Sequence, residues 1–330
     1  MENAITAGKQ QTKFGKRLIN FSLRYGIYLV FAVLCIGVSI ASPVFFTVSN
    51  LTNILLQTSA VGIIAVGMTF VIIARGIDVS VGAIVALSSA VAVTAMKLNG
   101  QPWWVGLILI LFVGFAVGLV NGVASAYLRM PPFLVTLATM TIAKGLVLSI
   151  TQGISQYGLP EFYPALGLGK VGPIPIPVIL LLVAFLIGYV ILSKTVFGRK
   201  VYAVGGNPDA ARVSGIDVEK TIMLTFIILG LFSGLSSLVL TSRLNSFSPT
   251  MGTGFEFSAI AAVVIGGTSL AGGEGNIGGT LIGVLIMGVI NNALNLLGVS
   301  VYYQDITRGA IIFLAVMIDA LRNRYAQTLD

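Results

Sequence analysis

The chain has 330 residues, of which 56% are hydrophobic and only 9% are charged, and its mean hydropathy is +1.00. Soluble globular proteins carry about 25% charged residues, so this composition excludes an ordinary water-solvated surface and indicates a polytopic membrane protein. It also excludes a nucleic-acid-coating protein, despite the net charge of +8. The sequence has no histidine, which excludes imidazole catalysis and histidine-ligated metals, and its single cysteine, Cys35, cannot form an internal disulfide.

Apolar runs long enough to cross a bilayer core, which takes about 20 helical residues, recur along the chain. We expect about ten transmembrane helices, at 25–45, 54–74, 79–96, 103–127, 133–151, 176–193, 221–241, 255–270, 277–299 and 305–321. The third and eighth runs are short and rich in glycine and serine, so either is a candidate for a broken or re-entrant helix. The expected fold class is therefore an all-α polytopic membrane protein.

The basic residues indicate the orientation, because lysine and arginine in short loops stay on the cytoplasmic side. With the N-terminus inside, only Lys97, Lys170 and Arg243 fall on the outer side, while Lys144 and Arg308 lie within or at the end of a span. This topology predicts a cytoplasmic N-terminal segment at 1–24, a single transmembrane domain at 25–321 with a cytoplasmic loop at 194–220, and a cytoplasmic tail at 322–330.

Two local patterns predict contacts between or at the ends of spans. Gly114, Gly118 and Gly122 repeat every four residues along the fourth run, which favours close contact with another helix. Arg75 and Asp78 are three residues apart between the second and third runs, where we expect them to pair while Asp78 caps the third span. We interpret this pair as structural, and a role in gating is the alternative.

Two longer hydrophilic segments interrupt the short connections. The outer one, at 152–175, is rich in glycine and proline and should form an irregular cap. In the inner one, Asn207 is a preferred N-cap, Pro208 suits the first helical position, Asp209 complements the positive end of the helix dipole, and Gly215 supplies a stop. The pattern predicts a helix of about two turns at 208–214, outside the membrane.

A helix this short is unstable in water on its own, because nucleation is costly and few hydrogen bonds follow. We therefore expect it to dock on a partner through a small apolar face of Ala210, Ala211 and Val213, beside the charge of Arg212. Gly205 and Gly206 precede it and allow a sharp turn. A plain solvated connection is the alternative interpretation of this segment.

Uncharged polar residues within the spans are candidates for contact with a neutral solute, which needs hydrogen-bond partners along its path. They are Gln57, Asn121, Thr136, Thr139, Asn291, Asn292 and Asn295. Asn291 and Asn295 lie one turn apart on the same helix face and are the strongest candidates. Hydrogen bonding between helices is the alternative role.

Four stretches of the chain resemble the membrane permease subunits of bacterial ABC importers for monosaccharides, of the ribose, xylose, arabinose and galactose type, with the ribose type most alike. The stretches are GMTFVIIARGIDVSVGAIVALSSAV from Gly67, FGRKVYAVGGNPDAARVSGI from Phe197, EFSAIAAVVIGGTSLAGGEGN from Glu256 and RGAIIFLAV from Arg308. The resemblance covers nearly the whole chain. It implies the ten-helix (type II) permease fold of the vitamin B12 importer, with ribose or a related monosaccharide as the solute.

The same resemblance implies partners and a location in the bacterial inner membrane with both termini cytoplasmic. A second permease copy, giving a homodimer, would complete the pore, although pairing with a different permease stays open. A periplasmic or lipid-anchored sugar-binding protein would deliver the solute. A cytoplasmic ATPase with two fused nucleotide-binding domains would use ATP and Mg²⁺, and the chain itself, which has no GxxxxGK[ST] run, would bind no cofactor.

In permeases of this family a cytoplasmic coupling helix lies between the sixth and seventh spans, where the short helix at 208–214 is expected independently. The resemblance implies hinge glycines, a capped docking helix and arginine contacts to the ATPase. The residues concerned are Gly198, Arg199, Tyr202, Gly205, Gly206, Asn207, Pro208, Asp209, Ala210, Arg212 and Gly215.

Two other classes of protein compete with this interpretation. A secondary transporter driven by protons or sodium would normally carry carboxylates within its spans, and Glu256, Asp305 and Asp319 lie at span ends. A membrane enzyme would need a reactive constellation near the bilayer surface, and the sequence offers none. An energy-passive permease is therefore favoured, and an enzyme is not expected.

Overall fold

The computed structural model describes residues 26–160 and 162–327. Each of the ten apolar runs coincides with a helix, and the expected all-α polytopic class is confirmed. These helices are Gly26–Ala41, α2 (Val48–Ile73), α3 (Val81–Lys97), α4 (Trp103–Ala126), α5 (Pro132–Thr151), α7 (Ile176–Lys194), α10 (Val218–Leu244), α11 (Phe255–Ile265), α12 (Ile277–Leu296) and α13 (Val301–Gln327). The predicted segments 1–24 and 328–330 lie outside the described residues.

Six of the described helices are long and apolar enough to cross a membrane, namely α2, α4, α5, α7, α10 and α12. Gly26–Ala41, α3 and α11 are apolar but shorter, as expected for the third and eighth runs. About ten spans therefore stays a prediction. In α2, 83% of the most apolar stretch of 18 residues is buried inside the protein, whereas the corresponding share is 33% in α4 and 22% in α5. The core thus surrounds α2, and α4 and α5 turn apolar faces outward as lipid-facing helices do.

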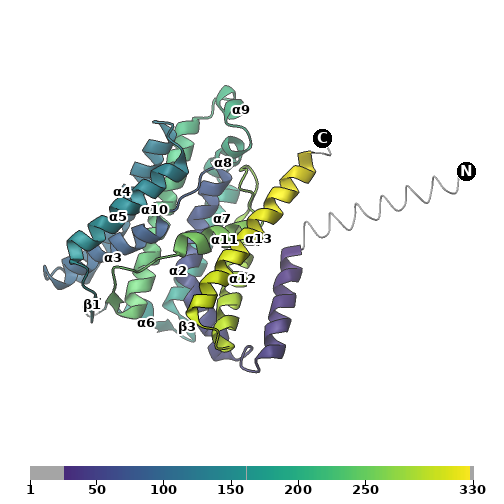
Figure 1. Ribbon diagram of the computed structural model, residues 1–330. Helices are drawn as coiled ribbons and strands as arrows, with labels where there is room; N and C mark the ends of the chain where they lie inside the picture. The colour runs from purple at the N-terminus through teal and green to yellow at the C-terminus, as the bar shows by residue number, and fades with distance from the viewer. Residues whose placement is uncertain (1–25, 161, 328–330) are drawn as a thin grey trace, which may run out of the picture.

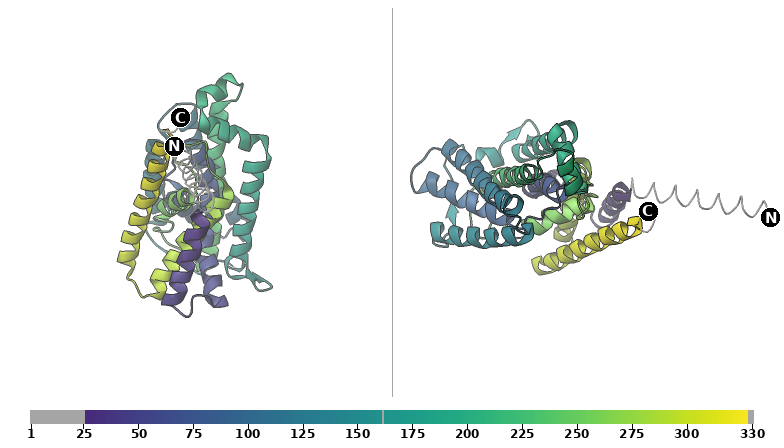
Figure 2. Two further views of the ribbon diagram at one scale, coloured as in Figure 1. Left: turned by 90° about the vertical axis from the view of Figure 1, so that its right-hand side faces the viewer. Right: turned by 90° about the horizontal axis from the view of Figure 1, so that it is seen from above.

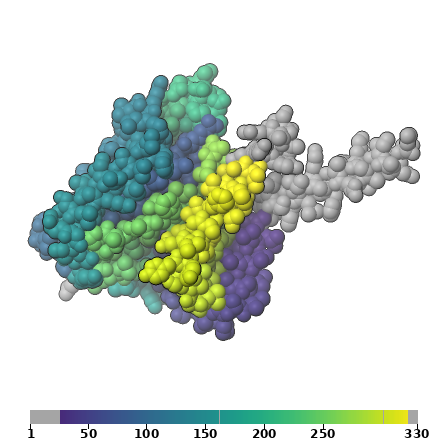
Figure 3. All heavy atoms as spheres, viewed as in Figure 1, coloured from purple at the N-terminus to yellow at the C-terminus, as the bar shows by residue number. Residues whose placement is uncertain are grey.

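The helices form an elongated bundle with different elements at its two ends (Figure 1). The views in Figures 1 and 2 place α3, α4 and α5 on one side, with α13 and the helix Gly26–Ala41 on the other. Figure 3 shows α13, in yellow, lying at the surface of the displayed face. The end of the bundle near α9 is opposite the end that carries β1, α6 and β3.

The segment at 152–175, predicted to face outward, is irregular as expected, and its described residues form only short regular elements. It contains β1 (Gln156–Tyr157), α6 (Ala165–Leu168), β2 (Lys170–Val171) and β3 (Ile174–Pro175). Strand β1 pairs antiparallel with β4 (Ser246–Phe247), and β2 pairs antiparallel with β3. The first pairing ties the cap to the connection that follows α10.

Small residues bring α4 and α10 into close contact, as the glycine repeat predicts. A Cβ atom built at Gly114 would overlap the carbonyl oxygen of Gly230, and one built at Gly230 would overlap the carbonyl oxygen of Gly114. Gly118 and Gly122 face the α10 backbone at Phe226 and Met223 in the same way. The expectation of close helix packing is therefore confirmed.

The segment at 194–220 contains two helices rather than the one predicted. The predicted short helix is present as α9 (Pro208–Val213), and α8 (Val196–Gly206) precedes it. Sequence analysis did not anticipate α8. The side-chain oxygen of Thr195 accepts a hydrogen bond from the Gly198 N–H at 3.2 Å and caps its start. Gly205 and Gly206 therefore end a helix, and the direction of the chain changes at Asn207.

The expected pairing of Arg75 with Asp78 is wrong, since the described structure contains no ion pair between them. Arg75 donates instead to the carbonyl oxygens of Gly205 and Gly206. Asp78 accepts from the backbone N–H and the hydroxyl of Ser80, and Ser80, not Asp78, is the N-cap residue of α3. The two side chains lie in different surroundings, since Arg75 is exposed beside the end of α8 whereas Asp78 is buried beside Ser80 and Asn121.

Candidate functional site

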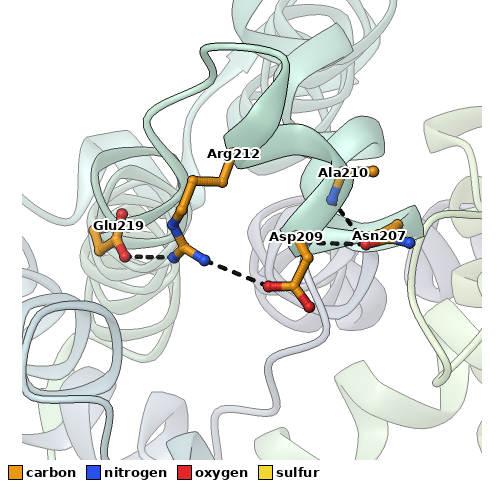
Figure 4. A network of polar contacts seen from close by, with 5 residues as sticks. All are labelled: Asn207, Asp209, Ala210, Arg212 and Glu219. Atoms are coloured by element: carbon orange, nitrogen blue, oxygen red, sulfur yellow. Dashed lines mark hydrogen bonds and ion pairs between the residues drawn. The ribbon is translucent and has the colours of Figure 1, made fainter.

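Helix α9 is short, and its first turn is closed by local hydrogen bonds (Figure 4). The side-chain oxygen of Asn207 accepts hydrogen bonds from the N–H groups of Asp209 and Ala210, both at 3.0 Å. Pro208 occupies the first helical position. Gly215 has φ +79°, a conformation that favours glycine, and its N–H donates to the carbonyl of Arg212 at 3.0 Å. Both predicted caps are confirmed.

Only one face of α9 is anchored to the rest of the protein. Ala211 is 4% exposed and packs with Val204 of α8 and Val218 of α10. Val213 is 91% exposed, and Ala210 is also exposed. The apolar face predicted from the sequence is therefore divided, with Ala211 buried inside the protein and Ala210 and Val213 facing outward.

Arg212 ties α9 to the start of α10 through charged contacts (Figure 4). Its guanidinium lies 2.6 Å from the carboxylate of Glu219 and 3.5 Å from that of Asp209. The Arg212 side chain is about half exposed and Asp209 almost fully so, so solvent screens the longer contact and each pair contributes at most about 1 kcal/mol. These contacts orient α9 without fixing it rigidly.

The remaining predicted coupling residues lie on α8, where Gly198 and Gly205 pack closely against the ends of α7 and α2. Gly198 packs against the carbonyl of Leu192, and the Tyr202 hydroxyl donates to the carbonyl of Gly275 at 2.7 Å. Arg199 is exposed and donates only to the carbonyl of Thr195, at 3.3 Å. Gly205 meets the backbone at the end of α2 so closely that no side chain fits there.

A polar cavity of about 240 Å³ lies between α2, α11, α12 and α13. Three of the predicted path residues, Gln57, Asn291 and Asn295, line it together. Asn291 is half-buried, and Gln57 and Asn295 are exposed. Amide groups that are accessible inside a cavity are suited to hydrogen-bonding an uncharged polar solute.

Helix α13 contributes two further polar residues to this cavity, which sequence analysis did not include among the path candidates. Gln304 donates to the side-chain oxygen of Asn295 at 2.9 Å, and the Arg308 guanidinium lies 3.1 Å from the carboxylate of Asp305. Gln304 and Arg308 are four residues apart and share one helix face. Their spacing could have indicated a polar face on α13, but nothing in the sequence indicates that this face lies against α12.

Three of the remaining path candidates lie around the buried Asp78. Asn121 is fully buried and donates to Asp78 at 3.2 Å, while Thr139 donates to the Asn121 side-chain oxygen at 2.7 Å. Thr136, also fully buried, accepts from the N–H of Val79 at 3.2 Å. These residues connect α4 and α5 to the α2–α3 connection, so their contacts match the alternative role of bonding between helices.

Asn292 forms a reciprocal amide pair that is separate from the cavity. Its side chain donates to Asn50 at 2.8 Å and accepts from Asn50 at 3.0 Å, and both residues are buried. The Asn50 amide also donates to the carbonyl of Phe45 at 2.9 Å. This pair fixes α12 against the start of α2 and thereby sets which face of α12 turns toward the cavity.

The chain matches a known family over most of its length. Residues 50–316 match the family model described as a branched-chain amino acid transport system / permease component, and the chain belongs to this family of transport permeases. The family and the apolar helices together identify a multi-pass membrane protein.

Its relatives include permeases named for sugars. The ribose import permease protein of Bacillus subtilis is 47% identical over 90% of this chain and 92% of its own length. The D-allose transport system permease protein of Escherichia coli is 40% identical over 93% and 95%, and the xylose transport system permease protein of the same species is 34% identical over 94% of each. No solved structure shows significant similarity to the chain.

Proposed function

We propose that the chain is the transmembrane permease subunit of an ATP-driven, binding-protein-dependent importer of a monosaccharide, ribose or a related sugar. Relatives that cover about nine-tenths of the chain are named for ribose, allose and xylose transport. The proposal includes the type II permease fold with about ten spans. It also includes a bacterial inner-membrane location with both termini in the cytoplasm, which the basic connections support.

The observation that carries the coupling part of the proposal is the outward face of α9. A capped helix of six residues lies at one end of the bundle with Val213 91% exposed. Exposed apolar side chains on a protruding helix are suited to insertion into a groove of a partner. The partner that we propose is a cytoplasmic ATPase with two fused nucleotide-binding domains, which would bind the ATP and Mg²⁺.

The cavity between α2, α11, α12 and α13 is the proposed solute path. Its amide and hydroxyl groups match the hydrogen-bonding needs of a sugar, and its volume of about 240 Å³ accommodates a single monosaccharide. A second permease copy would complete the path, and a periplasmic or lipid-anchored binding protein would deliver the sugar to the outer cap at 152–175.

A gradient-driven transporter is the second candidate, because the structure buries two carboxylates, Asp78 at 1% and Glu256 at 6% exposure. Buried carboxylates are the usual proton sites of such transporters. The Asp78 carboxylate, however, accepts hydrogen bonds from Ser80 and Asn121. This arrangement is typical of a structural carboxylate, and Glu256 lies in the first turn of α11, where the helix dipole stabilises a carboxylate, so the ATP-driven function is better supported.

The experiment that tests the proposal is purification of the tagged, full-length chain from its native membrane in mild detergent. We expect an ATPase to copurify, with its hydrolysis rate changed by a sugar-loaded binding protein, and mass spectrometry would identify both partners. Recovery of the chain alone, together with sugar flux that follows an ion gradient in liposomes, would support the second candidate instead.

Neighbouring asparagines on α12 should respond differently to substitution. Asn291→Ala is expected to reduce sugar uptake by about tenfold while the melting temperature stays unchanged, because its side chain faces the cavity and makes no described contact essential to packing. Asn292→Ala removes the donor to the buried side-chain oxygen of Asn50, which costs about 1–3 kcal/mol, and should lower the melting temperature. Thermal unfolding monitored by size exclusion, alongside uptake, separates the two; equal melting of both variants contradicts these assignments.

A charge exchange separates the internal contact of Arg212 from its contact with a partner. Arg212→Glu places a carboxylate beside Glu219 and Asp209 and should loosen α9 from the start of α10, which lowers coupled uptake. The double variant Arg212→Glu with Glu219→Arg restores the internal ion pair. If α9 also uses Arg212 to bind the ATPase, the double variant should regain the wild-type melting temperature but should not bind the ATPase in a pull-down. Recovery of both the melting temperature and ATPase binding would show that Arg212 is not part of the partner interface.

A further inference from the structure

The connection between α2 and α3 touches the α8–α9 junction at one end. Arg75, the second residue after α2, has φ +66°, a backbone conformation that is unusual for a residue other than glycine. Its Nε donates to the carbonyl of Gly205 and its Nη2 to the carbonyl of Gly206, both at 2.6 Å. One guanidinium therefore holds the two residues that immediately precede the N-cap of α9.

The backbone around Arg75 packs closely against two other segments of the chain. The N–H of Gly273 donates to the carbonyl of Ile73 at 2.9 Å, and a Cβ atom at Gly205 would lie 2.6 Å from the Gly273 nitrogen. Gly272, with φ +84°, passes directly against the Arg75 side chain. Three segments thus pack together here: the end of α2, the end of α8 and the loop at 272–275. Within this unit, Arg75 links the end of α2 to the end of α8.

The other end of the same connection is bonded to α4 and α5. Asp78 is 1% exposed and accepts from Ser80, through its N–H at 2.7 Å and its hydroxyl at 2.6 Å. Asn121 of α4 donates to both Asp78 and Ser80, and Thr136 of α5 accepts from the N–H of Val79. Buried, satisfied polar networks of this kind hold one arrangement rigidly.

We infer that the connection at 75–80 is a strut that links α9 to α3, α4 and α5, and that Arg75 is the positioning residue at its α9 end. The inference deepens the proposed function, because a displacement of α9 by the ATPase would reach the membrane helices through Arg75. Coupling of this kind requires a contiguous set of rigid contacts between the two regions. Here the two regions are joined by the six-residue backbone at 75–80, which is hydrogen-bonded at its Arg75 end to the end of α8 and at its 78–80 end to α4 and α5.

The first test uses the full-length chain in lipid nanodiscs and measures amide hydrogen exchange. Arg75→Gln is expected to speed exchange at least tenfold both in 207–213 and at 77–80. Asp78→Asn, at the other end, should also speed exchange in 207–213, because coupling between two sites is reciprocal. Changes confined to the mutated end of the strut in both variants would overturn the inference.

Arg129→Gln is the matched control for Arg75→Gln. Arg129 lines the same cavity of about 460 Å³ as Arg75 and also has positive φ, at +54°, but in the described part of the chain it makes no hydrogen bond to α8 or α9. The charge lost is the same, and we expect exchange in 207–213 to stay at the wild-type rate. An increase in exchange equal to that of Arg75→Gln would show that the faster exchange comes from loss of charge and not from loss of the two hydrogen bonds to α8.

The second test uses the complete importer in proteoliposomes and measures sugar molecules imported per ATP hydrolysed. Arg75→Gln should lower this ratio at least fivefold while ATP hydrolysis and ATPase binding persist. Arg75→Lys keeps the positive charge but offers a single donor nitrogen in place of the forked guanidinium, and should give an intermediate ratio. An unchanged ratio in Arg75→Gln overturns the inference. If the glutamine variant does not assemble, Arg75→Lys is the deciding variant: a lowered ratio supports the inference, and a wild-type ratio overturns it, because the paired guanidinium hydrogen bonds would then not be needed for coupling. Failure of the wild-type importer to use ATP would refute the proposed function, whereas the exchange test of the strut would still stand.

Discussion

Gly205→Ala is expected to abolish sugar uptake, whereas the same substitution at the adjacent Gly206 should leave uptake close to that of the wild type. A Cβ atom at Gly205 would overlap the carbonyl oxygen of Ile73 and approach the Gly273 nitrogen to 2.6 Å. Both obstacles are backbone atoms, so the end of α8 would have to move away from α2. Overpacking of this kind typically costs about 1–3 kcal/mol, and the shift would also separate Gly205 from Arg75.

Gly206→Ala is a close control, because it adds the same methyl group one residue later in the same helix. A Cβ atom there meets no described atom within 4 Å, and the hydrogen bond from Arg75 to the Gly206 carbonyl is retained. Uptake driven by ATP, measured together with the melting temperature, checks the pair. Equal loss in both variants would favour hinge flexibility, the role that sequence analysis assigned to these glycines, over close packing.

Gly230→Val is expected to produce the largest loss of folding stability among the substitutions considered. α4 and α10 make the most extensive contact between two helices in the described residues, and Gly230 and Gly114 lie where their backbones meet. A valine side chain would force the two helices apart along this interface, since the obstacle is again a carbonyl oxygen. We expect little or no folded, monodisperse protein by fluorescence-detected size exclusion.

The control for this prediction is Gly145→Val in α5. A Cβ atom there meets no described atom within 4 Å, and the helix turns an apolar face outward. Normal amounts of folded protein are therefore expected from Gly145→Val. Comparable loss in both variants would mean that valine in a transmembrane helix is itself harmful, and would contradict the importance of the α4–α10 contact.

Local chemistry allowed the coupling segment to be predicted from sequence. The cap of α9 depends on Asn207, Pro208 and Gly215, which lie within eight residues of one another, so the pattern alone identified the helix. Each of the ten apolar runs likewise fell on a helix, because length and apolarity are properties of single segments. The length of α11 was harder to predict, since its run of apolar and small residues continues past the residue where the helix ends.

Contacts between distant segments could not be predicted in the same way. Arg75 was assigned to the nearest acidic residue in the sequence, whereas its partners are carbonyl groups 130 and 131 residues away. Carbonyl groups leave no signature in a sequence. Asn291 and Asn292 are chemically identical neighbours, and only the packing of α12 against α2 turns one toward the cavity and the other toward Asn50.

The measurement that tests the central claim most directly is sugar uptake by the complete importer in proteoliposomes, with ATP available only on the side of α9. We predict that uptake requires ATP and the loaded binding protein, stops with the ATPase inhibitor vanadate, and is unaffected by ionophores that collapse proton and sodium gradients. Uptake that continues without ATP and disappears with the ionophores would contradict the account and identify a gradient-driven transporter.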